Sequence, residues 1–421
     1  CLTVFFTGVL PAVLVGVVRI GFKPFKRELM SRLTRVLAMF GLASVFAGMA
    51  YKDIVVYGRN YREGRKQINT LNYIHSTVRY FRRKAQAKRH FTTLDEKARL
   101  VPYENDRKTV FVLIVGETAR AANFSLYDYE RKTNPRLEKR NVIAFDHVTS
   151  CGTATAISLP CMFSNMSRAN FDVDDAKFTE NMLDLLKRSG YDVLWVENDN
   201  GCKGVCDRVE TKDVVAENDP EYCFGDYCHD AVLLKDLRKK LANVKRDTVV
   251  VLHMMGSHGP AYYKRYPDQF KVFLPTCDTT DIQGCSREAI VNTYDNTILY
   301  TDYVVSQAIK ELKKYPQYEA GLMYVSDHGE SLGENGIYLH GFPYKIAPKE
   351  QKGVPMILWL SETMRREDHM DYGCLKKLSK NNSFSHDNLY HTLLALLEIK
   401  TDTYEKRMDM FDACRMKPLP F

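Results

Sequence analysis

The sequence of 421 residues predicts an α/β fold, in which a parallel sheet with helices on both faces is preceded by transmembrane helices. Three observations support this prediction. After about residue 105, short apolar runs rich in Val and Ile alternate with stretches of helical spacing. The runs are apolar on both faces, as expected of buried parallel strands. Two segments near the N-terminus, residues 2–20 and 33–51, are almost free of charge.

These two segments are predicted to cross a membrane. The run at 2–20 is close in length to the roughly 20 residues that a helix needs to span the hydrocarbon core. In the run at 33–51, Arg35 can reach the interface at one end and Tyr51 can lie in it at the other. A buried core hairpin is the alternative. Mature lipoproteins also begin with Cys, but here Cys1 leads into a full span, so residues 1–51 are interpreted as the remnant of a larger membrane domain.

Charge suggests how the chain is oriented. The predicted loop at 21–35 carries five basic residues and one acidic residue, which places it in the cytoplasm and the rest of the chain outside. Residues 51–100 hold thirteen Lys or Arg against four Asp or Glu, which favours the opposite orientation. We interpret 52–105 as a basic connector that faces anionic head groups at the membrane interface. A solvated helix face is the alternative, and no nucleic-acid partner is expected.

Cysteine usage favours an exported domain. Ten of the eleven Cys follow residue 150, and eight of them form close pairs, which predicts disulfides in an oxidising compartment such as the periplasm. We therefore assign residues 106–421 to a periplasmic domain. The close pairs are Cys151 with Cys161, Cys202 with Cys206, Cys223 with Cys228 and Cys277 with Cys285, and Cys374 with Cys414 is a weaker fifth. A structural zinc site at Cys202, Cys206, Cys223 and Cys228 is the alternative.

Hydrophobic patterning places the main elements of this domain. The predicted strands are residues 109–116, 191–196, 248–255, 321–326 and 354–360. The predicted helices are residues 180–187, 231–241 and 296–312. No internal repeat interrupts this alternation.

Polar residues follow three of the predicted strands. Glu117 follows the first, His258 the third, and Asp327 and His328 the fourth. Because ligands gather beyond the carboxyl ends of parallel strands, we expect these side chains to meet at one edge of the sheet. Carboxylates with imidazoles are the set that a catalytic zinc or manganese ion prefers. Each motif alone could instead be a surface or capping pair.

A nucleophile is expected in the segment TSCGTATAISLPCMFS. It supplies Thr153, Thr155 and Ser158 in a turn of small residues before an apolar, helical run. A hydroxyl at a helix N-terminus faces a phosphate cradle of backbone N–H groups, and a metal ion can lower its pKa. Helix capping by Thr or Ser is the alternative. Cys151 and Cys161 bracket the segment and would hold it still.

Several motifs together resemble one enzyme family. They are VGETAR, SCGTATAISLPCMFS, CKGVCD, MGSHGPAYYKRYP, YDN, YVSDHGESLGENGIYLHG and APKEQKGVP. They resemble the lipid A phosphoethanolamine transferases, the polymyxin-resistance enzymes of the alkaline phosphatase superfamily, over about residues 108–355. That family usually has five membrane helices, so about three are expected to be missing here.

The resemblance implies an alkaline-phosphatase-like fold and specific site residues. The implied Zn²⁺ ligands are Glu117, Thr155, Asp327 and His328, with Thr155 as the residue that becomes covalently modified. The implied substrate-binding residues are His258, His340 and Lys203, of which the two histidines could instead hold a second metal ion.

The resemblance also implies an activity. A monomeric enzyme of the bacterial inner membrane would move phosphoethanolamine from phosphatidylethanolamine to a lipid A phosphate and so confer resistance to cationic peptides such as polymyxin. A phosphoglycerol transferase, or a phosphoethanolamine transferase acting on another envelope glycan, is the alternative. A sulfatase is disfavoured, because residues 151–155 lack the Pro and Arg signature of formylglycine formation. A non-catalytic sensor of lipid head groups is the alternative from another class.

Overall fold

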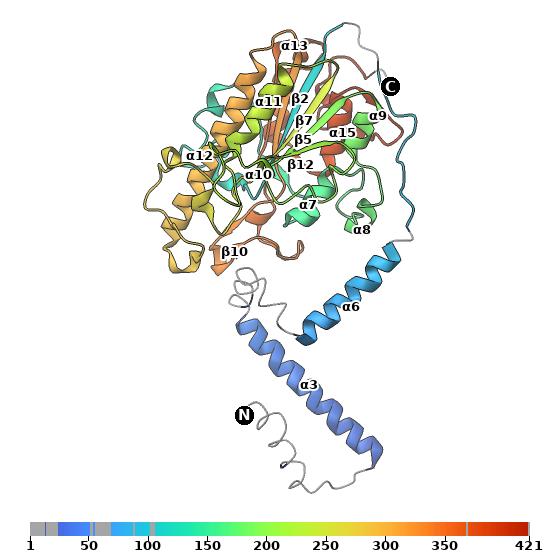
Figure 1. Ribbon diagram of the computed structural model, residues 1–421, viewed down its shortest axis with the longest axis vertical. Helices are drawn as coiled ribbons and strands as arrows, with labels where there is room; N and C mark the ends of the chain where they lie inside the picture. The colour runs from blue at the N-terminus through green and yellow to red at the C-terminus, as the bar shows by residue number, and fades with distance from the viewer. Residues whose placement is uncertain are drawn as a thin grey trace. The chain divides into compact units, whose positions relative to one another are not determined.

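The structure is a computed structural model that describes residues 13, 24–50, 54, 69–86, 89–101, 106–367 and 369–419. The chain divides into two compact units, residues 1–85 and 86–421 (Figure 1). Apart from Val13, the first predicted span lies outside the described residues.

Helix α3, Phe25–Met49, is the main element of the first unit. Among the described residues it is the one helix that is long and apolar enough to cross a membrane, by length and composition alone. The prediction of a loop at 21–35 was wrong for residues 25–35, because these residues form the first turns of α3. Lys, Arg and Glu are good helix formers, and Arg32 pairs with Glu28 at 3.0 Å one turn apart, so the charges do not delay the start of the helix.

The predicted connector, residues 52–105, contains helix α6, Asn69–Gln86. Ile74, Val78 and Phe81 recur at helical spacing along α6 and are exposed, as is typical of a helix at a membrane interface.

Residues 89–101 fall within the same predicted connector but belong to the second unit. Thr92 bridges to Thr179, and strand β1, Arg99–Leu100, pairs with β13, Ile399–Lys400.

The second unit is built on a seven-stranded sheet with the order β3-β11-β8-β2-β7-β5-β6. The strands are β2 Thr109–Gly116, β3 Ile143–Phe145, β5 Asp192–Glu197, β6 Glu210–Asp213, β7 Thr248–His253, β8 Glu319–Ser326 and β11 Met356–Leu360. The five predicted strands are all present. Their common direction is confirmed except for β11, which runs antiparallel to both β3 and β8. A strand that is buried on both faces carries no pattern that encodes its direction, so this exception could not be seen in the sequence.

Helices cover both faces of the sheet (Figure 1). Alternate side chains of β2 enter two separate cores: Val112 packs in the core that includes α11 and α12, and Leu113 packs in the core that includes α9 and α15. These helices are α9 Met182–Arg188, α11 Leu233–Leu241, α12 Arg287–Leu312 and α15 Asp387–Leu396. The three predicted helices are therefore confirmed, and α12 begins nine residues earlier than expected, after the N-cap Ser286.

Shorter elements complete this unit. They are β4 His147–Thr149, α7 Thr155–Met162, α8 Val173–Ala176, α10 Val214–Glu217, β9 Ser331–Leu332, β10 Tyr338–Leu339, α13 Glu362–Glu367, α14 Tyr372–Asn381 and β12 Ser383–Ser385.

The predicted disulfides are confirmed. The bonds are Cys151–Cys161, Cys202–Cys206, Cys223–Cys228, Cys277–Cys285 and Cys374–Cys414. The alternative of a structural zinc site at Cys202, Cys206, Cys223 and Cys228 is therefore wrong, because their sulfur atoms are bonded to one another.

Candidate metal centre and nucleophile

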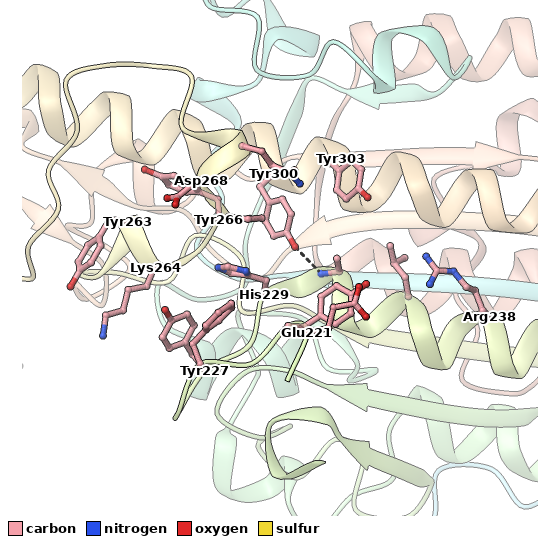
Figure 2. Close-up of a pocket in the computed structure, with 16 residues that line it drawn as sticks. Glu221, Tyr227, His229, Arg238, Tyr263, Lys264, Tyr266, Asp268, Tyr300 and Tyr303 are labelled. Atoms are coloured by element: carbon pink, nitrogen blue, oxygen red, sulfur yellow. Dashed lines mark hydrogen bonds between the residues drawn. The ribbon is translucent and has the colours of Figure 1, made fainter. Parts of the chain in front are cut away.

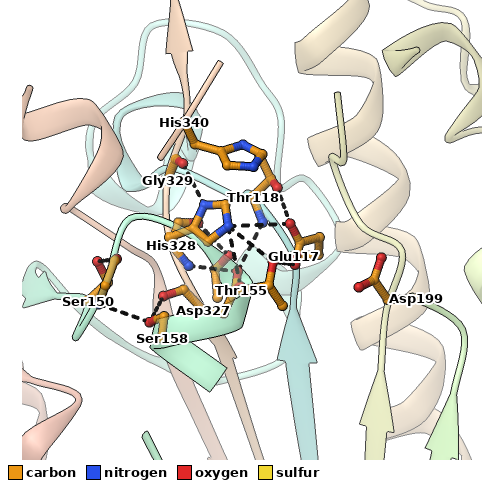
Figure 3. A network of polar contacts seen from close by, with 12 residues as sticks. Glu117, Thr118, Ser150, Thr155, Ser158, Asp199, Asp327, His328, Gly329 and His340 are labelled. Atoms are coloured by element: carbon orange, nitrogen blue, oxygen red, sulfur yellow. Dashed lines mark hydrogen bonds and ion pairs between the residues drawn. The ribbon is translucent and has the colours of Figure 1, made fainter. Parts of the chain in front are cut away.

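Four neighbouring strands bring polar side chains to one edge of the sheet. Glu117 follows β2, Asp327 and His328 follow β8, His253 ends β7, and Asp199 follows β5. Because β8, β2, β7 and β5 are adjacent and parallel, their carboxyl ends meet (Figure 3). The predicted convergence of Glu117 with the pair after β8 is thus explained by strand order.

Thr155 is the hydroxyl that reaches this edge. It is the first residue of α7, and its Oγ1 donates a hydrogen bond to Oε2 of Glu117 at 2.9 Å. The same oxygen lies 3.4 Å from Nε2 of His328. Thr155 is partly exposed, so a substrate can reach it.

The other two candidate hydroxyls are used within the protein. Thr153 donates to the carbonyl of Phe342 at 2.5 Å, and Ser158 donates to the carbonyl of Asp327 at 2.5 Å. The N-cap of α7 is Ala154, and it makes no side-chain capping bond. Helix capping therefore does not explain the hydroxyl of Thr155.

His328 presents a nitrogen lone pair to the site. Its Nδ1 lies 2.9 Å from the carbonyl oxygen of Gly329, so Nδ1 carries the proton and donates it there. Nε2 is left as an acceptor and lies 3.4 Å from carboxylate oxygens of both Glu117 and Asp327. An imidazole whose other nitrogen is held by a backbone carbonyl is the usual arrangement of a metal ligand.

Asp327 also leaves one oxygen for a cation. Its Oδ1 accepts hydrogen bonds from the backbone N–H groups of Thr118 and His328 at 3.2 and 2.7 Å. Its Oδ2 is buried and has no hydrogen-bond partner among the described residues. A buried carboxylate oxygen without a partner is costly unless a cation is bound to it.

The electrostatics of the site agree with this interpretation. Glu117, Asp327 and His328 are fully buried. Burial and the neighbouring Asp327 raise the pKa of Glu117, and burial raises the pKa of Asp327 to about 7. Two buried carboxylates side by side are unfavourable unless a positive charge lies between them. With Thr155, these side chains offer the oxygen and nitrogen donors that Zn²⁺ accepts, so the residues present fit a zinc ion.

The two other predicted histidines lie beside this group. The ring of His340 is 4.3 Å from that of His328, and its Nδ1 is 2.7 Å from Oε2 of Glu330. The ring of His258 is 6.1 Å from that of His340. Burial, together with the nearby charge of Arg265, lowers the pKa of His258 to about 3, so this imidazole is neutral.

Lys203 is placed differently from the other predicted site residues. Its Nζ donates to the carbonyls of Asn200 and Gly201 at 2.5 and 2.9 Å, within its own loop. Lys203 also has a positive φ of 54°, consistent with a turn. No contact joins Lys203 to Thr155 in the described structure.

Two groups of residues were missed by the sequence analysis, and the first is His386. Its Nδ1 accepts a hydrogen bond from the backbone N–H of Cys151 at 3.1 Å, and its Nε2 donates to the carbonyl of Ser326 at 3.0 Å. His386 therefore ties the segment that carries Thr155 to the end of β8. No sequence pattern marks it, because Ser326 lies 60 residues away.

The second missed group surrounds His253. Its Nδ1 lies 2.9 Å from both carboxylate oxygens of Glu197. One nitrogen of His253 and one oxygen each of Glu117 and Asp199 lie within 4.8 Å of one another. His253 does interrupt the apolar run of its strand, which is a signal in the sequence, but the predicted site included His258 of the following loop and not His253.

A large cavity lies apart from these residues. It has a volume of about 650 Å³ and contains none of the predicted site residues in its lining. Figure 2 shows the tyrosines that surround it, among them Tyr227, Tyr263 and Tyr300, with Lys264 and Arg238. The cavity is not part of the candidate metal centre, whose donor side chains are packed against one another.

Comparison with known proteins agrees with this architecture. The family model described as "Sulfatase" matches residues 109–399, and that described as "Phosphoethanolamine transferase EptA/EptB" matches residues 1–85. The phosphoethanolamine transferase EptA of Escherichia coli K12 is 46% identical over 420 residues, covering 98% of this chain and 76% of the relative.

A second relative and a solved structure point to the same family. The phosphatidylethanolamine transferase Mcr-2 of Escherichia coli is 35% identical over 95% of this chain and 75% of its own length. The integral membrane lipooligosaccharide phosphoethanolamine transferase A from Neisseria meningitidis has a TM-score of 0.81 and 41% identity, covering 97% of this chain and 77% of its own. The resemblance found in the motifs is confirmed, as is the alkaline-phosphatase-like fold. The chain belongs to the EptA family of phosphoethanolamine transferases.

Proposed function

We propose that this transferase moves phosphoethanolamine from phosphatidylethanolamine to a phosphate of lipid A, through a covalent intermediate on Thr155 at a zinc centre. The observation that carries the proposal is the position of the Thr155 hydroxyl, which lies between Oε2 of Glu117 and Nε2 of His328. The names of the relatives support phosphoethanolamine as the transferred group, and two further relatives are named Kdo(2)-lipid A phosphoethanolamine 7''-transferases.

Glu117, Thr155, Asp327 and His328 would hold the zinc ion. When bound there, the ion would lower the pKa of the Thr155 hydroxyl and stabilise negative charge on the phosphoryl oxygens. The Thr155 hydroxyl already donates to Glu117, so this carboxylate can hold the proton that the hydroxyl loses.

The reaction has two steps. First, the Thr155 oxygen bonds to the phosphorus of phosphatidylethanolamine while the bond from phosphorus to the diacylglycerol oxygen breaks, and that oxygen takes up a proton. Then an oxygen of a lipid A phosphate bonds to the same phosphorus, the bond to Thr155 breaks, and the threonine regains its proton. Such a covalent relay divides one difficult transfer between two large lipids into two simpler steps.

The first turn of α7 would bind the phosphoryl oxygens. The N–H groups of Ile157 and Ser158 make the first bonds of this helix, both to the carbonyl of Ala154. The amides of Thr155 and Ala156 precede these bonds and lie at the positive end of the helix dipole. The imidazoles of His258 and His340, and Lys203 from its separate loop, are the further substrate contacts that we propose.

The location follows from the substrates. Both are membrane lipids, and α3 is long and apolar enough to hold the enzyme beside them. We place the enzyme in the bacterial inner membrane as a monomer, with its disulfide-rich catalytic domain in the periplasm. Each transfer would give an anionic phosphate an ammonium group, which weakens the attraction of lipid A for cationic peptides such as polymyxin.

Peptide mass spectrometry tests the intermediate. The wild-type chain incubated with phosphatidylethanolamine vesicles should carry phosphoethanolamine on the peptide that contains Thr155. Thr155→Val should carry none, whereas Thr149→Val, which removes an exposed hydroxyl from the neighbouring strand β4, should be labelled like the wild type. An unlabelled wild-type peptide during turnover would overturn the mechanism.

The lipid A mass spectrum of expressing cells tests the products. A gain of phosphoethanolamine on lipid A supports the proposal. A gain of phosphoglycerol, or of phosphoethanolamine on another envelope glycan, would identify one of the alternative transferases instead.

A further inference from the structure

Next to the Thr155 site, three side chains converge without bonding to one another. One imidazole nitrogen of His253 and one carboxylate oxygen each of Glu117 and Asp199 lie within 4.8 Å of one another. They come from the carboxyl ends of β7, β2 and β5, which are consecutive in the sheet. Glu117 belongs to both groups, and Figure 3 shows Asp199 on the side of Glu117 that faces away from His328.

The orientation of His253 is fixed from behind by Glu197. Both oxygens of this carboxylate lie 2.9 Å from Nδ1 of His253. Glu197 is itself held by the indole N–H of Trp195 at 2.8 Å and by the backbone N–H of Asp199 at 2.7 Å. In the neutral imidazole the proton therefore sits on Nδ1, and Nε2 is the nitrogen left to bind a cation within the group.

This nitrogen lacks a partner in the described part of the chain. His253 is fully buried, and its Nε2 makes no hydrogen bond. An unpaired polar atom in a core is costly, so it indicates a binding partner that belongs to the site. Histidines that bind metals almost always donate their second N–H to a carboxylate, a backbone carbonyl or water, and His253 has the carboxylate of Glu197 in this position.

The spacing of the three donors suits one cation. Nitrogen and oxygen ligands lie about 2.0–2.2 Å from zinc, so neighbouring ligands of one ion are roughly 3–4 Å apart. The donors here lie within 4.8 Å of one another, so a small movement of each side chain would bring them to that spacing around one ion. We propose that Glu117, Asp199 and His253 form a second divalent-cation site of the zinc class, which shares Glu117 with the Thr155 centre.

Because Glu117 would belong to both sites, an ion in the second site would affect the Thr155 centre. A cation on the Asp199 side would hold Glu117 in the rotamer that accepts the Thr155 hydroxyl, and it would offset one of the buried negative charges. Asp199 and His253 are thus assigned as positioning residues that act through Glu117. Binding of the ion does not depend on the proposed transfer reaction, so the two can be tested separately.

Zinc stoichiometry tests the proposal. The full chain in detergent is stripped with chelator, equilibrated with Zn²⁺ at a buffered free concentration, and its zinc is counted by mass spectrometry. Asp199→Asn keeps the shape of the side chain and removes its charge, so it should bind one zinc ion fewer than the wild type. His253→Gln should lose the same ion.

A matched control is Asp128→Asn. Asp128 is exposed and has a φ of 63°, a conformation that Asn tolerates, so this variant should bind as much zinc as the wild type. Equal zinc counts in the wild type, Asp199→Asn and His253→Gln, with all three folded, would overturn the proposal. That result would make His253 a protonated side chain that serves as the local positive charge itself.

Thr155→Val separates this inference from the proposed function. Diffraction from zinc-loaded crystals of this variant at the zinc edge should still show a peak about 2.0–2.2 Å from Nε2 of His253. If the wild type is never labelled on Thr155 but the Asp199-dependent ion persists, the proposed mechanism fails and the second site stands. If labelling is normal and no such peak is present, the second site fails alone.

Discussion

The hydroxyl of Thr155 lies 2.9 Å from Oε2 of Glu117, although the two residues are 38 positions apart and belong to a helix and a strand end. The hydroxyl is not used as a helix cap, because Ala154 is the N-cap of α7, and the carboxylate of Glu117 is fully buried. This pairing is the geometric basis of the first prediction.

Removing the Thr155 hydroxyl should abolish transfer. Thr155→Val keeps the shape of the side chain but cannot form the intermediate, so the rate of lipid A modification should fall by about 10³-fold or more. Thr155→Ser should retain part of the activity, because it keeps the oxygen and loses only a methyl group. Steady-state transfer from a fluorescent phosphatidylethanolamine checks both. Activity of the valine variant within tenfold of the wild type would contradict the assignment.

Asp327→Asn should lose zinc binding without losing stability in the absence of metal. The amide cannot supply the second anionic oxygen, so zinc and activity should be lost together. In chelator, however, this variant should melt at or above the wild-type temperature, because burial holds the pKa of Asp327 up to about 7 beside Glu117 and the amide removes that repulsion.

In the presence of Zn²⁺, the wild type should melt at a higher temperature than Asp327→Asn. At a free concentration 100 times its Kd, a ligand that binds only the folded state stabilises it by about 2.7 kcal/mol. Calorimetric melting with and without Zn²⁺ measures both effects. A zinc-dependent rise of equal size in Asp327→Asn would argue against Asp327 as a ligand.

Gly329→Ala should disrupt the site through the backbone. A Cβ at Gly329 would collide with the carbonyl oxygen of Glu350, which is held in a turn and cannot move aside easily. The carbonyl of Gly329 orients His328, so activity and stability should fall together, with a stability loss of about 1–3 kcal/mol or more. Gly284→Ala is the control, since the nearest atom there is 3.7 Å away. Urea melts and activity of the two variants make the comparison, and equal behaviour would contradict the predicted clash.

His386 should make the fold sensitive to acid. Burial lowers its pKa from 6.5 to about 3, so the unfolded chain binds a proton that the folded chain refuses. Its contribution to stability is therefore unchanged above pH 6.5 and becomes increasingly unfavourable as the pH falls from 6.5 towards 3. At pH 5.5 the loss from this residue should be about 1.4 kcal/mol.

His386→Asn supplies the comparison for this effect. The Asn oxygen can accept the bond from the N–H of Cys151, and the side chain does not titrate. The free energy of unfolding of the variant should fall less steeply between pH 7 and 5.5 than that of the wild type. If the free energies of unfolding of the two proteins fall equally with pH, the pKa of His386 is not lowered in the folded chain and the prediction is wrong.

Much of the site was predictable because local sequence encodes it. Apolar runs placed the strands, and Glu117 and the pair Asp327 and His328 follow them directly, so their meeting at one edge required only that the strands be parallel. Close spacing likewise predicted the disulfides, because short loops bring their cysteines together.

Local sequence did not show which of several neighbouring hydroxyl or histidine residues belongs to the site. Thr153, Thr155 and Ser158 are equivalent as a string of hydroxyl residues, and they differ only in that Phe342 and Asp327 accept bonds from two of them. For the same reason His258 was predicted in the site and His253 was not, because the partner of His253, Glu197, lies on the neighbouring strand β5.

The sequence by itself determined the α/β alternation, the apolar helix near the N-terminus, the disulfides and the motifs that mark the family. Only the tertiary structure set the reversed direction of β11, the hydrogen bonds of Lys203 within its own loop and the partners of His253 and His386. The physical reason is range: periodicity and spacing act within one element, whereas an unpaired buried nitrogen exists only once distant strands have excluded water from around it.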